Sequence, residues 1–166
     1  MPTIKIVPMP GVSVPGPQGP QGETGPAGAD ATFPSPTNWT PVMNTVNGDF
    51  VQTLNPATGT YMKYGRMVVV NLFIPFSQTT NFGTGQYVVT LPFTATFHQD
   101  VVAGSLHNTN ASAHYTVKGH LNDGSNEMTI WYISGTSKDE PFTATSPIAV
   151  ATDDLFHMSF IYETNQ

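Results

Sequence analysis

The side chains that could do chemistry are few, and the histidines are the first group to consider. The chain has five of them, at His98, His107, His114, His120 and His157. His114 and His120 share one face of a predicted strand. Six residues of extended chain separate this pair by about 20 Å, so the two side chains cannot hold one metal ion within a single chain. Only a three-fold axis could gather copies of one histidine, and we predict no metal site.

The acidic residues form two pairs, Asp139-Glu140 and Asp153-Asp154, both in predicted loops. Calcium needs six to eight oxygen ligands, and neither pair follows the EF-hand pattern. A glycosidase needs two carboxyl groups across a cleft, and nothing in the sequence indicates such an arrangement. The nucleophile elbow Gly-x-Ser-x-Gly is missing, and Gly83-Thr-Gly85 lacks the residues that complete a phosphate-binding loop. We predict a protein that is not an enzyme and needs no cofactor.

Two adjacent aromatic residues, Trp131 and Tyr132, could contact a carbohydrate. Successive residues of a strand point to opposite faces, so one of these two rings should be exposed. Aromatic rings also serve as packing residues in cores and interfaces, which is the alternative interpretation. We interpret Trp131 and Tyr132 as candidates for glycan contact.

Composition excludes several functional classes. Only 10% of the residues are charged, and five Lys/Arg against eleven Asp/Glu give a net charge of −6, which does not suit binding to nucleic acid. The absence of cysteine excludes disulfides and cysteine-bound zinc. No apolar window approaches the roughly 18 residues of a membrane span, and the N-terminus lacks the apolar region of a secretory signal. We therefore expect no membrane insertion, and release by cell lysis as part of a particle.

A strict glycine repeat occupies residues 16–30. Five triplets follow one another in phase, with glycine at Gly16, Gly19, Gly22, Gly25 and Gly28 and with proline second in three of them. Three polyproline II chains wound together leave room for only a hydrogen atom at their axis, so every third residue must be glycine. The repeat predicts a collagen-like stalk about 45 Å long. A flexible Gly/Pro linker is the alternative.

The residues before and after the repeat receive separate predictions. Residues 1–15 contain a β-prone apolar run with Ile4, Ile6 and Val7. We interpret this segment as an extended peptide that anchors the protein to a partner, with a disordered tail as the alternative. Residues 31–40 are predicted to be a linker.

Residues 41–166 are predicted to form an all-β domain, a jelly-roll-like antiparallel β-sandwich. Short strand candidates alternate with turn signals, and no segment has a helical period. In residues 113–121 polar and apolar side chains alternate, and near the C-terminus Phe156, Met158, Phe160 and Tyr162 form one apolar face. The other strand candidates are 50–54, 60–64, 67–76, 86–93, 100–106, 127–133, 148–152 and the C-terminal 155–163.

The candidate strand 67–76 differs because it is apolar on both faces. A strand of a small two-layer sandwich has one face turned away from the core, so a doubly apolar strand needs a second burial partner. A subunit interface would supply that partner, and we assign Val68, Val70, Leu72 and Ile74 to a core strand at a trimer interface. The alternative is a central strand covered by a loop.

A collagen-like stretch joined to a β domain of about 130 residues resembles the trimeric fibre proteins of tailed bacteriophages. The segment 59–70 resembles a hairpin with the pattern Gly-x-Tyr-x-Lys-x-Gly-x-x-Val in such modules, and Leu91-Pro-Phe-Thr-Ala95 and Phe160-Ile-Tyr-Glu163 are similar in style. Complement-C1q-like trimers share the layout. The resemblance implies a homotrimeric component of a virion and supplies no catalytic residue.

The repeat, the β domain and the resemblance together predict a structural protein of a virion. We expect a homotrimer that is attached through its N-terminus to another virion protein and that displays its β knob to a host-surface glycan. Placement on the phage tail or baseplate is preferred, and a capsid decoration fibre is the alternative. A glycan-degrading enzyme and a collagen-like protein of a bacterial surface remain further alternatives.

Overall fold

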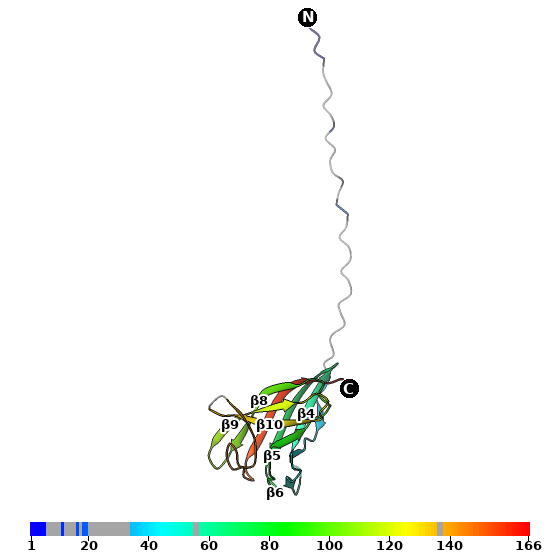
Figure 1. Ribbon diagram of the computed structural model, residues 1–166. Helices are drawn as coiled ribbons and strands as arrows, with labels where there is room; N and C mark the ends of the chain where they lie inside the picture. Colours follow the sequence, from blue (N-terminus) through cyan, green and yellow to red (C-terminus); the bar gives the residue numbers. More distant parts are fainter. Residues whose placement is uncertain (6–10, 12–15, 17, 20–33, 55–56, 136–137) are drawn as a thin grey trace. The chain divides into compact units, whose positions relative to one another are not determined.

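The computed structural model describes residues 1–5, 11, 16, 18–19, 34–54, 57–135 and 138–166. The chain divides into two units, Met1–Thr32 and Phe33–Gln166. All strands of the described residues lie in the second unit, and the same residues include no helix of the length and apolarity needed to cross a membrane. The ribbon of this second unit is shown in Figure 1.

The second unit is all-β, which confirms the predicted class. Its strands are β1 (Thr37–Trp39), β2 (Met43–Thr45), β3 (Val51–Gln52), β4 (Thr58–Tyr64), β5 (Met67–Pro75), β6 (Thr79–Asn81), β7 (Tyr87–Thr90), β8 (Gln99–Asn108), β9 (Ala113–Leu121), β10 (Glu127–Ile133), β11 (Asp139–Pro141) and β12 (Leu155–Glu163). Ten strands form one antiparallel sheet in the order β1-β4-β5-β12-β8-β9-β10-β7-β2, with β11 beside β10. Strands β3 and β6 form a separate pair.

The large sheet curls, so that its two halves face each other across one core (Figure 1). Phe142 lies at the centre, with its ring 5.1 Å from that of Tyr87 on β7 and 6.1 Å from that of Phe156 on β12. Strand β8 lies in the middle of the sheet order and joins its two halves, because it pairs with β12 on one side and with β9 on the other. A β-bulge between Val102 and Gly104 interrupts its register, and bulges increase the twist of a sheet. This arrangement is consistent with a β-sandwich.

The bulge requires a residue without a side chain. A Cβ at Gly104 would lie 2.4 Å from the side chain of Met158 and 2.7 Å from the carbonyl oxygen of His157 on the neighbouring strand. Close approach of two strands is a common reason for glycine inside a strand. Gly104 therefore helps β8 to pack against β12 where the sheet curls.

The alternating strands have the faces that their sequences predicted. On β12 the four side chains Phe156, Met158, Phe160 and Tyr162 are all buried in the core. On β9 the apolar side chains Val117 and Leu121 are buried, and His114 and Thr116 are exposed on the opposite face. Lys118 also lies on that opposite face, but it is buried there. Period-2 alternation is a local property of the chain, and the structure confirms it in these two strands.

Several segments differ from the prediction. The acidic pair Asp139-Glu140 was predicted to lie in a loop, but it lies in β11, which pairs with β10. Strands β2 and β6 are also absent from the predicted strands. Residues 37–39, which were assigned to the linker, form β1 and pair with β4. The predicted strand 148–152 is wrong, because this segment folds back on itself. The amide of Val150 donates to the carbonyl of Ala144 (2.9 Å), and the amide of Ala151 donates to the carboxylate of Asp154 (2.9 Å). These local bonds replace the ladder that a strand would need.

Candidate functional site

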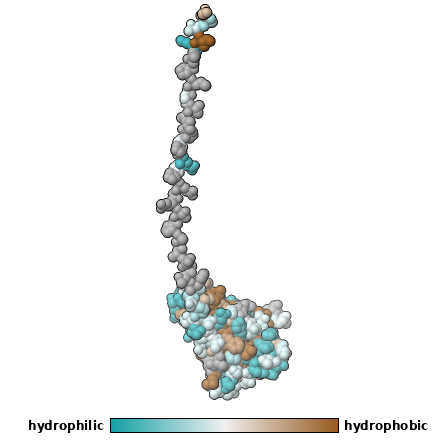
Figure 2. All heavy atoms as spheres, turned by 180° about the vertical axis from the view of Figure 1, so that it is seen from behind, coloured by the Kyte–Doolittle hydropathy of each residue, from teal (hydrophilic) through white to brown (hydrophobic). Residues whose placement is uncertain are grey.

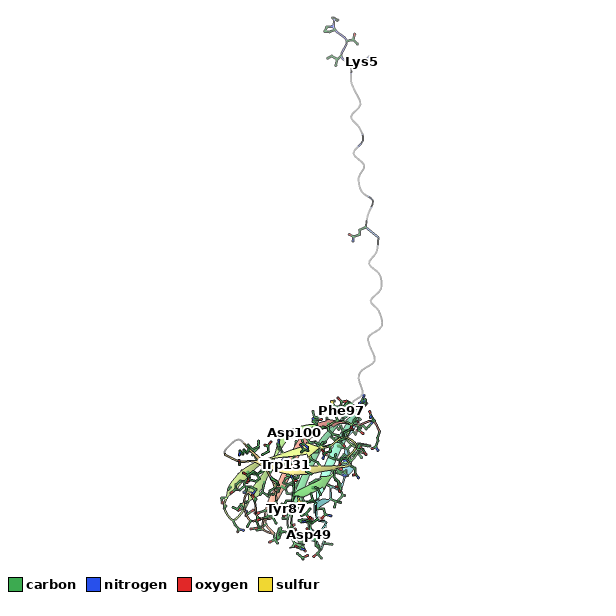
Figure 3. All side chains as sticks on the ribbon, viewed as in Figure 1. Lys5, Asp49, Tyr87, Phe97, Asp100 and Trp131 are labelled. Atoms are coloured by element: carbon green, nitrogen blue, oxygen red, sulfur yellow. The ribbon has the colours of Figure 1, made fainter. Side chains whose placement is uncertain are left out.

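The outer face of β8, β9 and β10 carries a cluster of ionisable side chains beside a tryptophan. The register places Asp100 opposite His120 and places Lys118 opposite Trp131. All four therefore lie on the face of the sheet that points away from the core. Figure 3 labels Asp100 and Trp131, which lie on neighbouring parts of this sheet, whereas Asp49 and Tyr87 lie toward the other end of the unit.

Lys118 is a nearly buried cation at the centre of this cluster, with 11% of its side chain exposed. Its ammonium group pairs with Asp100 at 3.2 Å and makes a second, shorter contact with Asp139 of β11. The hydrogen bond with Asp139 raises the pKa of Lys118, burial opposes this shift, and Asp100 adds to it. Two carboxylates thus hold one positive charge, as a buried ammonium requires.

Asp100 also contacts the histidines. Its Oδ1 lies 2.7 Å from Nδ1 of His120, and the rings of His98 and His120 meet edge to face at 4.3 Å. Partial burial acts to raise the pKa of Asp100, but the hydrogen bonds from His120 and Lys118 outweigh it and hold this pKa below its usual range. Among the described residues, His98, Asp100 and His120 form one group whose potential ligand atoms all lie within 4.8 Å of one another.

The sequence did not predict this group. The signal was a His-x-Asp pair at residues 98–100, of which His98 lies just before β8 and Asp100 lies within it. The third member, His120, is distant in sequence and joins the pair through the ladder of β8 and β9. His114, which was predicted to share a strand face with His120, lies at the other end of β9 and stacks on His107 at 4.4 Å.

Trp131 and Tyr132 lie on opposite faces, as their adjacency in a strand predicted. Trp131 is half-buried on the outer face, where its Nε1–H donates to Oγ1 of Thr129 (3.1 Å) and its ring lies 6.3 Å from that of His120. Tyr132 packs against the core, and its hydroxyl donates to Glu140 (2.7 Å). Of the two predicted glycan contacts, only Trp131 belongs to the outer cluster. Its role in binding stays a prediction.

The four acids of the two carboxylate pairs differ in their partners and in their burial. Asp139 binds Lys118 and Glu140 accepts from Tyr132, so both acids of the first pair have partners within the chain. In the second pair Asp153 is exposed and Asp154 is fully buried. The Asp154 carboxylate accepts bonds from the turn after β8, and it is a structural group.

Another carboxylate, Asp49, organises a loop at a distance from the cluster. It accepts a hydrogen bond from the hydroxyl of Thr45 and bonds from the amide and hydroxyl of Thr84 (2.8 and 2.6 Å). These hydrogen bonds, those of Thr45 first, lower the pKa of Asp49 to about 2. Gly83 next to it has a φ of 71°, and a Cβ there would lie 2.6 Å from the carboxylate. Asp49 closes the loop.

The predicted interface strand is β5, and the structure divides its residues between two faces. Val68, Val70, Leu72 and Ile74 are all buried in the core of a single chain, with at most 1% of their surface exposed. These four cannot contact a second chain while the core is intact.

The opposite face of β5 is the one that a partner could reach. Met67 and Phe73 are 40% and 37% exposed, and Ile161 of neighbouring β12 is 50% exposed. A groove of about 580 Å³ lies on this side, between β1, β4, β5 and β12, with Asn71, Phe73 and His157 among its lining residues. Figure 2 shows one face of the unit, where brown apolar areas are set among pale and teal polar surface.

The predicted N-terminal sites lie mostly outside the described residues. Ile4 is described and exposed, whereas Ile6 and Val7 of the proposed anchor are not described. Of the repeat glycines, Gly16 and Gly19 are described, and Gly22, Gly25 and Gly28 lie outside the described residues.

The described part of the chain thus defines an all-β protein with an ionisable and aromatic cluster on one outer face and an apolar, grooved surface on another. Comparisons with known protein families, with curated proteins and with solved structures find no match for this chain.

Proposed function

We propose that this protein is the homotrimeric fibre of a bacteriophage particle, in which a collagen-like triple helix carries a jelly-roll-like β knob. The observation that carries the proposal is the run of five Gly-X-Y triplets, in phase, directly before an all-β unit. Among the described residues, no atom lies within 4 Å of a Cβ built at Gly16 or Gly19. A steric need for glycine at these two positions would come from neighbouring chains, as in a triple helix.

The β units of the trimer meet, in this proposal, through the outer face of β4, β5 and β12. The register aligns Met62, Val69 and Ile161 across these three strands, which makes a continuous apolar row on the outer face. An exposed apolar surface of this kind commonly marks an interaction site. The proposed interface therefore uses the outward-facing residues of β5, which alternate with the four buried side chains that the sequence had suggested.

The face of β8, β9 and β10 then stays free to contact the host. Trp131 offers a flat ring beside hydrogen-bonding groups, which is a combination that suits a sugar. Three copies on one fibre would raise the effective concentration of a weak contact. Residues 1–15 would attach the fibre to another virion protein, on the tail or baseplate in our preferred placement and on the capsid in the alternative.

The solution mass of the full-length chain tests the trimer. One chain is 17.8 kDa, so light scattering should give about 53 kDa. Ile161→Asp should reduce this mass to that of a monomer, because it places three charges in the proposed contact. The matched control is Val51→Asp, which charges a similarly exposed aliphatic residue on β3 and should leave the trimer intact. A monomeric wild type would overturn the proposal, and a trimeric Ile161→Asp would overturn the proposed face.

Attachment is tested separately with host cells. Trp131→Ala should weaken binding of the fluorescent trimer, whereas Phe97→Ala, at an exposed ring beside Arg66, should not. Release of soluble sugars from host polysaccharide would favour the glycan-degrading alternative. Equal binding by the wild type and Trp131→Ala would contradict the predicted glycan contact of Trp131.

A further inference from the structure

We propose that His98, Asp100 and His120 form a binding site for a divalent transition-metal ion, with Zn²⁺ as the fitting ion. The site belongs to one chain and lies where the ladder of β8 and β9 ends. It does not depend on the trimer or on the glycan contact, and the sequence alone does not predict it.

The fold places the three donors on one side of the sheet. Asp100 and His120 are direct partners in the antiparallel ladder, so their side chains leave the sheet on the same face. His98 lies just before β8 begins, and its ring meets that of His120 edge to face at 4.3 Å, which places it beside the other two donors. The positions of Asp100 and His120 therefore follow from the register, and His98 joins them through its ring contact with His120.

The distances between the donors suit an ion after small side-chain movements. Nδ1 of His120 lies 2.7 Å from Oδ1 of Asp100, and one potential ligand atom from each residue lies within 4.8 Å of the others. Zinc bonds of about 2.0–2.2 Å to nitrogen and oxygen require tetrahedral ligands somewhat over 3 Å apart. His98 and Asp100 are exposed, and His120 is partly exposed, so the rings can turn toward an ion without disturbing the core.

The surrounding charges favour a cation, even though an ammonium group is near. Lys118 contacts Oδ2 of Asp100 at 3.2 Å, but it also pairs with Asp139. Two carboxylates and one ammonium leave a local charge of −1 when the histidines are neutral. Lys118 also occupies Oδ2, so Oδ1 is the oxygen that faces the histidine. The carboxylate of Asp139 therefore offsets the charge of Lys118, and Lys118 in turn orients the carboxylate of Asp100.

The type of donor selects the class of metal. Two imidazoles and one carboxylate suit zinc and similar first-row ions, whereas calcium and magnesium take oxygen ligands in larger number. Three protein ligands leave a fourth position of zinc open to water or to an external oxygen ligand. The ring of Trp131, 6.3 Å from that of His120, flanks this position.

Calorimetry of the untagged full-length chain with zinc chloride tests the proposal. We expect one zinc ion per chain, a raised midpoint of thermal unfolding, and reversal of both effects by EDTA. Calcium chloride should give no comparable binding. The titration is done at about pH 7.5, because protons compete with a metal ion for its ligand atoms at lower pH.

Three variants locate the ion. His120→Ala and Asp100→Asn should each weaken zinc binding by at least tenfold to a hundredfold, since even outer partners of metal ligands have effects of this size. The matched control is His107→Ala, which removes a histidine of the other cross-strand pair of β8 and β9 and should bind zinc normally. Thermal unfolding without metal verifies that each variant is folded.

Four results would overturn the site. These are no binding of zinc by the wild type, unchanged binding by His120→Ala, equal loss in His107→Ala, and one ion per three chains, which would indicate an ion on a three-fold axis.

Discussion

Replacement of the buried carboxylate of Asp154 by a methyl group should strongly destabilise the β unit. The carboxylate is fully buried and accepts three hydrogen bonds: from Nδ2 of Asn108 (2.8 Å), from the amide of Thr109 (2.9 Å) and from the amide of Ala151 (2.9 Å). Together they fasten the turn after β8 to the turn before β12. Asp154→Ala leaves these donors without their acceptor.

The expected loss follows from the number and type of these bonds. A hydrogen bond to a charged acceptor contributes about 1.5–3 kcal/mol, and an unsatisfied buried donor costs about 1–3 kcal/mol. The variant also avoids the desolvation of the carboxylate, which offsets part of the loss. We therefore expect a decrease of about 3–4 kcal/mol in the free energy of unfolding. For a domain of this size, that decrease lowers the midpoint of thermal unfolding by roughly 10–15 °C.

Urea and thermal denaturation followed by far-UV circular dichroism measure this change. The matched control is Asp153→Ala, because Asp153 is the adjacent acid, is exposed, and contributes its backbone carbonyl to Thr109. This control should stay within about 0.5 kcal/mol of the wild type. A loss below about 1 kcal/mol in Asp154→Ala, or equal losses in both variants, would refute the reasoning.

Three further predictions concern packing, acid stability and a buried tyrosine. Gly119→Ala should lower the free energy of unfolding, measured by urea denaturation, by about 1–3 kcal/mol, because its Cβ would lie 2.0 Å from a buried methionine sulfur on β10. The control is Gly135→Ala, because a Cβ at that position meets nothing within 4 Å. Equal losses in the two variants would contradict the packing argument. Asp49 should make stability acid-dependent: its folded pKa of about 2 lies below the unfolded value near 4, so its contribution is complete above pH 4 and disappears as pH falls through 2. Urea midpoints of the wild type and Asp49→Asn should therefore converge toward pH 2, and a constant difference would argue against this origin. Tyr162→Phe should lower the free energy of unfolding by about 1–3 kcal/mol, because the hydroxyl donates to the carbonyl of Phe93 (2.8 Å) and accepts from its amide (3.0 Å). A variant as stable as the wild type in urea would show that water replaces both bonds.

Local sequence patterns predicted the long strands well and the short ones poorly. Strands 113–121, 127–133 and 155–163 have the predicted bounds. Each is at least seven residues long and contains a stretch in which polar and apolar side chains alternate. Strands β1, β2, β6 and β11 have three residues each, too few for a period to be detected. These short strands form because a neighbouring strand offers them a hydrogen-bonding edge.

The candidate site was harder to predict than the fold. The aromatic pair at 131–132 was identified from its residue types, and the alternation of strands separated its two faces. The group formed by His98, Asp100 and His120 was missed, because the spacing of histidines along one strand does not reveal how β8 aligns with β9. The burial of Val68, Val70, Leu72 and Ile74 also required knowledge of which face of β5 the core covers.

The sequence by itself determined the glycine repeat, the all-β class of residues beyond it, and the alternation that gives the long strands two distinct faces. These properties depend on neighbours within a few residues, because a strand repeats every two residues and a triple helix every three. Only the tertiary structure decided which acid of the pair Asp153-Asp154 is buried, which face of β5 is exposed, and which histidines meet a carboxylate. Those outcomes depend on the register between strands that are distant in the chain, and closure of the whole sheet around its core fixes that register.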